Sequence, residues 1–276
     1  MKDENLDSKV VEDFGKEWSS YSQDELPKRE SEEEFLNYSK IFPFNIIGTN
    51  SVGADFGCGS GRWAKHFAPK CKKLHCIDPS DAINVAKKNL RNFQNISFEK
   101  SSISTNFIED ESLDFAYCLG VLHHTPDPEL SMKDCVLKLK QGAPFLIYVY
   151  YRFDNQPIWY KWIWIISDLM RRLICRLPHK IKLLITLFVA FFVYLPFSRS
   201  SLLLEKLRFD VKSWPLSHYR NKSFYSLKTD ALDRFGTKLE FRYTKKEIKE
   251  MMQRQGLKNI KFSEGPPFWC AVGYKG

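Results

Sequence analysis

Glycines and acidic side chains early in this 276-residue chain are its strongest candidates for chemistry. Gly57, Gly59 and Gly61 alternate with other residues, directly after an apolar segment. Asp55 lies two positions before the first of them. Glycines at such a turn let backbone N–H groups approach a ligand, because no Cβ blocks the way. Since a carboxylate there would repel a phosphate, a ligand with a positively charged group fits better.

A second carboxylate stands at the end of the next apolar segment. Asp78 lies 21 residues after Gly57, where an acidic side chain can accept hydrogen bonds from both hydroxyls of a ribose. The glycine pattern is G-x-G-x-G, and Arg62 stands where the dinucleotide pattern G-x-G-x-x-G requires glycine. A G-K-[ST] phosphate-binding motif is missing as well. The predicted ligand therefore has a ribose and an ammonium group rather than a pyrophosphate.

Two neighbouring histidines are candidates for a general base. His123 and His124 follow the apolar segment 113–119, and the carboxyl ends of strands are where open sheets bind ligands. Imidazole titrates near neutral pH, so either ring could accept a proton from an acceptor group. Alternatively, the pair only shapes the wall of the pocket. Further candidates for the base are His218, Tyr219 and Tyr225.

Alternating strand and helix patterns must position these residues. Strands that alternate with helices predict a parallel sheet covered on both faces. A capping box of Thr244 and Glu247 predicts a late helix over 244–255. The expected strands are 51–56, 73–77, 96–98, 113–119, 143–151, 260–262 and 268–272, and the other expected helices are 32–47, interrupted by Pro43, one that follows Gly61, 81–92 and 127–139.

The alternation stops after residue 151 and resumes only near the end of the chain. We therefore expect an insertion in the core. The acidic N-terminal arm carries Phe14, Trp18 and Tyr21, which either pin the arm to the core or close it over the glycine turn as a lid. The expected parts are an arm and helix over 1–47, a ligand-binding core over 48–151, a helical insertion over 152–228 and the C-terminal part of the core over 229–276.

Three motifs in this order resemble the class I S-adenosylmethionine-dependent methyltransferases of the type 11 group. They are Asp55-x-Gly57-x-Gly59-x-Gly61, Asp78 after the second strand, and Asp114-Phe-Ala-Tyr-Cys-Leu-Gly-Val-Leu-His-His124. The resemblance covers about residues 50–150 and the closing elements. It implies an α/β fold with a Rossmann-like sheet, helices on both faces and S-adenosylmethionine as the cofactor.

The resemblance also implies roles for individual residues. The three glycines would approach the methionine moiety and the adenosine, and Asp55 would hold the amino group. Asp78 would bind the ribose. Ser102 stands where this family usually has an Asp for the adenine amino group, which is a departure from the pattern. The other residues expected to line the cofactor are Phe56, Pro79, Ile103, Leu119 and Gly120.

The segment after the fourth strand also bears on the acceptor. Residues 119–122, Leu-Gly-Val-Leu, replace the Asn/Asp-Pro-Pro-Tyr signature of many nucleic-acid amino methyltransferases. The resemblance therefore disfavours methylation of adenine or of a glutamine amide. It leaves open a partner subunit that keeps the fold without catalysis, although the intact glycines and Asp78 argue against that.

The insertion is both basic and apolar. Residues 158–228 hold 13 Lys and Arg against 3 Asp and Glu, a net charge of +10, whereas the whole chain carries +9. Two interpretations remain for residues 158–199: a helical cap over a lipophilic acceptor site, or a membrane-interface segment with its arginines on anionic lipid. Nucleic acid is disfavoured, because the charges interleave with long aliphatic runs.

A full membrane span is disfavoured by length. Residues 181–197 would give about 25 Å of helix at about 1.5 Å per residue. The hydrocarbon core of a bilayer is about 30 Å thick. Lys182 and Pro196 would shorten the apolar length further.

Seven cysteines, an odd number without a C-x-x-C pair, predict free buried thiols in a reducing compartment rather than disulfides or a metal site. The N-terminus has no apolar segment of a signal peptide. We expect a cytoplasmic protein, held at the inner face of the membrane if residues 158–199 bind lipid. Its expected activity is methylation of an oxygen or carbon atom of a small molecule or lipid-linked sugar. The alternatives are a membrane-surface enzyme acting on a quinone or other prenyl lipid, an RNA or protein methyltransferase, and the non-catalytic subunit.

Overall fold

The computed structural model describes residues 5–211 and 214–276, and the chain divides into two compact units. The absence of a signal peptide was inferred partly from residues 1–4, which lie outside the described residues. Unit 2 begins at Phe153, one residue after the expected start of the insertion, extends ten residues beyond its expected end to Lys238 and includes a short N-terminal segment. Unit 1 comprises Met1–Gln23, Glu32–Arg152 and Leu239–Gly276, and unit 2 comprises Asp24–Ser31 and Phe153–Lys238.

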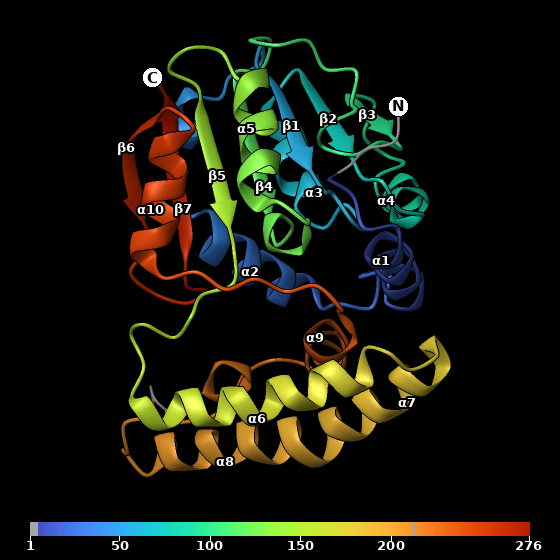
Figure 1. Cartoon of the computed structure of the whole chain (residues 1–276), viewed down its shortest axis with the longest axis vertical. Coiled ribbons are helices and arrows are strands. Elements are labelled where there is room, and N and C mark those ends of the chain that lie inside the picture. The colour runs from blue at the N-terminus through green and yellow to red at the C-terminus, as the bar shows by residue number, and fades with distance from the viewer. Residues whose placement is uncertain (1–4, 212–213) are drawn as a thin grey trace. The chain divides into compact units, whose positions relative to one another are not determined.

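Unit 1 is built on a seven-stranded sheet with the strand order β3-β2-β1-β4-β5-β7-β6 (Figure 1). Strands β3, β2, β1, β4 and β5 are parallel, as the sequence predicts. The expectation of an all-parallel sheet is wrong for β7, which is antiparallel to β5 and β6. Only residues 263–269 join β6 to β7, and a parallel pair needs a longer crossover. The strands are β1 Val52–Phe56, β2 Lys73–Ile77, β3 Ile96–Glu99, β4 Phe115–Leu119, β5 Pro144–Tyr148, β6 Leu257–Phe262 and β7 Cys270–Lys275.

Apolar side chains cover both faces of this sheet, as β4 illustrates. Phe115, Tyr117 and Leu119 point into a core shared with α3 and α4. Ala116 and Cys118 point into a second core shared with α5 and α10. This alternation follows from the two-residue period of a strand. The helices are α1 Ser8–Ser20, α2 Lys28–Ser39, which begins in unit 2, α3 Ala64–Phe67, α4 Ala82–Asn89, α5 Pro128–Lys138 and α10 Lys245–Arg254, with 3-10 turns η1 Phe44–Ile46, η2 Ala68–Lys70 and η3 Leu122–His124.

Capping side chains set the helix ends that the sequence located best. Asp127 accepts the N–H groups of the second and third residues of α5. Thr244 and Glu247 form the predicted capping box at the start of α10. The helix expected over 32–47 begins earlier, at Lys28, and ends at Ser39, and only a 3-10 turn follows the predicted interruption at Pro43. Pro43 lies between the two, and proline cannot continue a helix.

All regular structure described in unit 2 is helical, which confirms the predicted helical insertion (Figure 1). The first turn of α2 is tied to this unit through Glu30. Its carboxylate accepts the hydroxyl of Ser226 at 2.5 Å and the N–H of Ser223 at 3.0 Å. The helices are α6 Ile158–Ile174, α7 His179–Val189, the π-helical η4 Ala190–Tyr194, α8 Leu195–Lys206, the 3-10 turn η5 Ser217–Tyr219 and α9 Phe224–Gly236.

Helices α7, η4 and α8 run on as one helix of 28 residues, His179–Lys206. The length argument against a membrane span is therefore wrong. Pro196 does not end the helix, because a π-helical turn precedes it and such turns absorb irregular backbone hydrogen bonding. The helix is about 42 Å long at about 1.5 Å per residue. By length and composition it could cross a membrane.

The seven cysteines are all buried and free, as predicted. Cys76, Cys118 and Cys270 lie on strands of the sheet. Burial raises the pKa of the Cys76 thiol above its usual value. These thiols therefore act as small apolar core side chains.

Candidate active site

The glycine turn follows β1 at the carboxyl ends of the parallel strands. Gly57, Gly59 and Gly61 all have positive φ, at 77°, 52° and 77°. A Cβ on Gly57 would lie 2.4 Å from Cγ2 of Val121, and one on Gly59 would lie 3.0 Å from the indole nitrogen of Trp18. Both the backbone conformation and the lack of space therefore require glycine at this turn.

Asp55 is buried in β1, directly before the turn, with 1% of its surface exposed. Neither carboxyl oxygen makes a hydrogen bond of regular geometry among the described residues, although the nearby hydroxyl of Tyr117 interacts with this carboxyl group. Burial raises the pKa of Asp55 to about 8, and Asp78 adds to the rise, whereas Tyr117 and Arg62 oppose it. A buried carboxyl group without a partner is destabilising. The ammonium group of S-adenosylmethionine would supply the missing partner, so the residues present fit this cofactor.

Asp78 follows β2 and already takes part in the turn. One carboxylate oxygen accepts the N–H of Gly59 at 2.9 Å. The other accepts the N–H and the hydroxyl of Ser80, at 2.9 and 2.6 Å. A carboxylate offers about four acceptor positions, so one remains for a ribose hydroxyl. Burial raises the pKa of Asp78, although these three hydrogen bonds oppose the rise.

The remaining residues predicted to line the cofactor follow the ends of the neighbouring strands. Gly120 comes after β4 with φ of 86°, and among the described residues nothing beyond its chain neighbours lies within 4 Å of where its Cβ would stand. The hydroxyl of Ser102 lies 3.0 Å from that of Thr105. Pro79 is half-buried. The others are buried: Phe56 and Ile103 belong to the core shared with α5 and α10, and Leu119 to the core shared with α3 and α4.

Helix α1 covers the glycine turn with the side chain of Trp18. The sequence left open whether this residue pins the arm to the core or lies over the turn. Trp18 lies against Gly59, and the guanidinium carbon of Arg62 lies 5.4 Å from the Trp18 ring and 4.4 Å from the Trp63 ring. The amide of Asn89 holds the end of α1 by donating to the carbonyl of Ser22 at 2.7 Å. The arm is thus a docked helix that also lies over the turn. The signal was the spacing of Phe14 and Trp18, one helical turn apart.

His124 lies in η3, directly after β4, within a cluster of aromatic rings. Its Nδ1 lies 2.7 Å from the carbonyl oxygen of Leu239. Nδ1 must therefore carry the hydrogen, which leaves the lone pair on Nε2. The ring centroid of Phe14, from α1, lies 4.9 Å away.

His123 is fully buried beside it. Its ring centroid lies 4.0 Å from those of both His124 and Tyr150. Neither ring nitrogen has a hydrogen-bond partner among the described residues. Burial lowers the pKa of His123 well below its ordinary value, and His124 and Arg242 lower it further. His123 is therefore a neutral ring and a weak base. Tyr150 was missed, although it continues the alternation of Tyr148 past the end of β5.

The other candidates for a base belong to unit 2. His218 and Tyr219 lie in η5, and Tyr225 lies in α9. The ring of Tyr219 packs 5.4 Å from that of Tyr194. The ammonium of Lys228 lies 4.8 Å from the centre of the Tyr225 ring.

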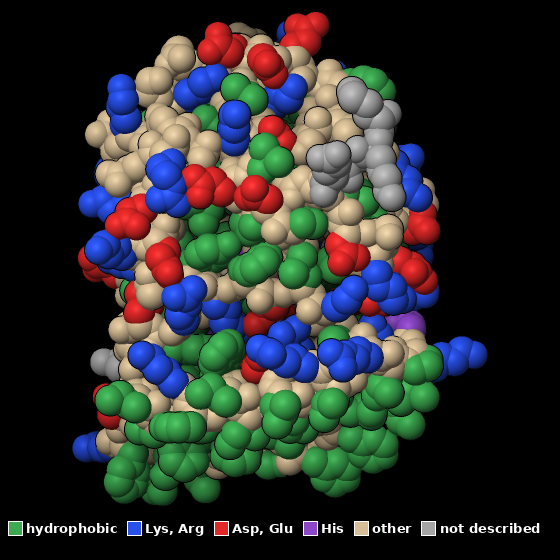
Figure 2. Space-filling model, viewed as in Figure 1, with side chains coloured by type: hydrophobic (Ala, Val, Ile, Leu, Met, Phe, Trp, Pro, Cys, Tyr) green, Lys and Arg blue, Asp and Glu red, His purple; other side chains and the backbone are tan. Residues whose placement is uncertain are grey.

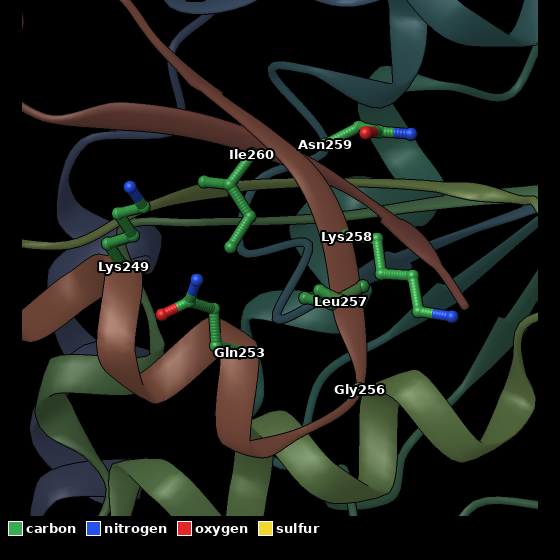
Figure 3. Close-up of a pocket in the computed structure, with 7 residues that line it drawn as sticks. All are labelled: Lys249, Gln253, Gly256, Leu257, Lys258, Asn259 and Ile260. Atoms are coloured by element: carbon green, nitrogen blue, oxygen red, sulfur yellow. The ribbon is translucent and has the colours of Figure 1, made fainter.

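One pocket of unit 1 lies elsewhere, between α10 and β6 (Figure 3). It sits at the first residues of β6, and β6 runs in the same direction as β5. The pocket is therefore at the opposite edge of the sheet from the glycine turn, and it contains none of the predicted site residues. Its lining residues are Lys249, Gln253, Gly256, Leu257, Lys258, Asn259 and Ile260.

Comparisons with known proteins agree with this geometry. Residues 54–147 match the family model described as a methyltransferase domain. A 116-residue stretch is 28% identical to the tRNA U34 carboxymethyltransferase of Nautilia profundicola and covers 41% of this chain and 38% of that protein. A 91-residue stretch is 30% identical to the ubiquinone biosynthesis O-methyltransferase of Coxiella burnetii and covers 32% of this chain and 39% of that protein.

The chain spans about two fifths of the length of the curated relatives it matches. A solved structure of human N-acetylserotonin methyltransferase, in complex with S-adenosylmethionine, resembles it with a TM-score of 0.50. That match has 15% sequence identity and covers 88% of this chain and 52% of the human one. At this identity the likeness shows the fold alone.

Proposed function

We propose that this chain, which carries a class I S-adenosylmethionine-dependent methyltransferase domain at residues 54–147, transfers a methyl group to a small-molecule or lipid-linked acceptor. Asp55 carries the proposal. Its carboxyl group is buried without a partner directly before the glycine turn. An ammonium group is the partner that such a carboxylate lacks, and S-adenosylmethionine has one.

The proposed role of the protein is to bind the cofactor, to align the acceptor and to exclude water from the site. Asp55 would hold the amino group of the cofactor, and Asp78 would accept a hydrogen bond from a ribose hydroxyl. Bound S-adenosylmethionine supplies a methyl group on a sulfonium, which is already electrophilic. Methyl transfer then depends mainly on the alignment of the acceptor and on a dry site. Trp18, which lies over the turn, would help to exclude water.

The proposed acceptor class is supported by the residues around η3. Phe14, His123, His124 and Tyr150 form an aromatic cluster, and aromatic walls suit a small or lipophilic acceptor. The names of the relatives point to two acceptor classes, a tRNA and a ubiquinone precursor. A prenyl lipid is the second candidate, and the apolar helices of unit 2 favour it over RNA.

Transfer of labelled methyl groups to fractions of the source cells tests the proposal. The protein would be incubated with methyl-labelled S-adenosylmethionine and, separately, with lipids, water-soluble small molecules, tRNA or protein. We expect label in the lipid or the small-molecule fraction, and none when the Asp78→Ala variant replaces the protein. Label in tRNA alone would overturn the acceptor class. If the protein binds neither the cofactor nor its demethylated product in calorimetry, the proposal that it is an enzyme is overturned.

We propose His124 rather than His123 as the general base for an oxygen acceptor. The Nε2 lone pair of His124 follows from its Nδ1 contact at 2.7 Å to the carbonyl oxygen of Leu239, whereas burial lowers the pKa of His123 well below its ordinary value. With the labelled acceptor as substrate, His124→Gln is expected to lower kcat about 100-fold or more with little change in KM. His75→Gln, which alters a ring bound to Ser97, is the matched control. A fall of less than tenfold would make His124 part of the pocket wall.

A further inference from the structure

On the two long helices of unit 2, several polar side chains are buried beside a small apolar core, whereas many large apolar side chains are exposed. On His179–Lys206, Lys182 and Thr186 are 2% and 0% exposed. Phe188 and Phe192, on the other side, are 55% and 63% exposed. A surface helix of a water-soluble protein has the opposite arrangement. Exposed apolar side chains on this scale fit an apolar environment rather than water.

The end of α9 keeps the polar residues inside. Lys182 donates to the carbonyl of Gly236 at 3.3 Å. On α6, Arg171 donates to the carbonyls of Thr237 and Lys238 at 2.9 and 3.0 Å and pairs with Asp168 at 2.8 Å. Cations are favourable at the carbonyls that end a helix. Turning either helix over would break these contacts, so the apolar sides are held outward.

The outward side chains form one apolar face of unit 2. Monomeric soluble proteins rarely expose an apolar patch of more than a few hundred Å². In the described part of the chain, 18 of the 27 exposed large hydrophobic side chains lie on these two helices. Figure 2 shows them gathered over α6, α7 and α8. They are Ile158, Trp159, Trp162, Ile163, Ile165, Ile166, Leu169, Met170, Leu173, Ile181, Leu184, Leu187, Phe188, Phe191, Phe192, Val193, Phe197 and Leu203.

Cationic side chains border this apolar face. Lys161 and Arg172 are exposed and lie 11 residues apart on α6, three helical turns, so they project from the same side. Arg176 and Lys180 are exposed where the two helices join. Figure 2 shows a row of Lys and Arg side chains along the edge of the green surface. Unit 2 as a whole holds 17 Lys and Arg against 9 Asp and Glu, a net charge of +8.

We propose that the apolar face of unit 2 docks into the surface of an anionic lipid bilayer, with α6 and the helix His179–Lys206 lying in the plane of the membrane. The apolar side chains would enter the boundary between headgroups and acyl chains, and the cationic border would contact lipid phosphates. A second copy of the chain fits less well, because it would bring another charge of +8 to the same border. The helix His179–Lys206 does not cross the membrane in this proposal, because its inner side, with the polar residues, packs against α9 and could not face lipid.

Docking of unit 2 is independent of methyl transfer, and it is tested without the cofactor. The full chain would be floated with vesicles of phosphatidylcholine alone and with vesicles containing about 30% phosphatidylglycerol. We expect binding to the anionic vesicles to be at least about tenfold stronger, and 1 M salt to reduce that preference. Nitroxide groups on the lipids should quench Trp162, 65% exposed, more strongly near the headgroups than at the bilayer centre. A Trp162→Phe variant identifies its share of the signal.

Matched substitutions separate the two parts of the face. Leu169→Glu with Phe188→Glu should lower vesicle binding at least about tenfold, whereas Phe107→Glu, at a side chain of unit 1 that is 88% exposed, should leave it within about twofold. Lys161→Gln with Lys180→Gln should lower mainly the preference for anionic vesicles. Failure of the unaltered chain to float would overturn the proposal, whichever variants fold. The proposal would also be overturned if the chain binds no vesicles but forms a dimer in ultracentrifugation that Leu169→Glu dissociates. Quenching that is strongest at the bilayer centre would overturn the in-plane orientation of the helices.

Discussion

Replacing Asp78 with Ala is expected to weaken the binding of S-adenosylmethionine and of its demethylated product at least about a hundredfold. The variant loses the remaining acceptor position for a ribose hydroxyl. It also loses three hydrogen bonds, to Gly59 and Ser80, that hold the turn. A hydrogen bond to a charged group contributes roughly 1.5–3 kcal/mol, and about 2.7 kcal/mol corresponds to a hundredfold change in affinity. Titration calorimetry with both ligands measures it.

Asp81→Ala is the matched control for this experiment. Asp81 lies three positions further on, with an exposed side chain paired to Lys100 at 2.7 Å. We expect its affinity to stay within about twofold of the unaltered chain. Asp78→Asn keeps an acceptor oxygen and should fall between the two. Unchanged affinity in Asp78→Ala would remove Asp78 from the cofactor site and would favour the non-catalytic subunit.

The affinity for the cofactor is expected to rise with pH up to about pH 8 and to level off above it. The pKa of Asp55 is raised to about 8, so below that pH the free protein holds its carboxyl group neutral. Only the ionised form pairs with an ammonium group, and therefore binding must release a proton. Each pH unit below 8 should then lower the affinity about tenfold. Calorimetry with the demethylated product, in buffers of different ionisation enthalpy, counts the released proton.

Asp55→Asn should separate binding from stability. The folded-state pKa of about 8 lies above the ordinary value of 3.8, so ionisation opposes folding. The free energy of unfolding is therefore highest at acid pH, where the carboxyl group is neutral in both states, and it falls as pH rises from about 4 to about 8. Asparagine cannot ionise. The variant without cofactor should therefore be more stable than the parent at pH 8, by on the order of a few kcal/mol, yet bind the cofactor more weakly and without the pH slope.

Thermal unfolding at pH 5 and pH 8 measures this difference. Asp110→Asn is the control, because Asp110 is exposed and its pKa is lowered by Lys138. It should leave both the pH slope of binding and the stability difference unchanged. If Asp55→Asn keeps the pH slope, another group releases the proton on binding and Asp55 does not hold the ammonium group.

The cofactor half of the candidate site could be predicted because its residues are close in sequence. Asp55, the glycine turn and Asp78 lie within residues 55–78, and a strand, a turn and the next strand necessarily bring them to one edge of a parallel sheet. The two covered faces of the sheet follow from the same local periodicities, whereas the strand order was not predicted. The acceptor half could not be predicted this way. Trp18 lies against Gly59 and Phe14 lies beside His124 only because α1 docks on the core, and no local pattern gives the partner of a helix.

The sequence by itself determined that residues 51–61 form a glycine turn suited to a ribose and an ammonium group, since conformation and charge there are local properties. It also predicted that residues 158–199 are apolar and belong to a helical insertion. Only the tertiary structure decided which side of those helices faces outward. A helical pattern repeats in the same way whether its apolar side meets a core or a membrane. The choice depends on carbonyls at the end of α9 and directly after it, which hold Lys182 and Arg171 inward and leave the apolar side chains outside.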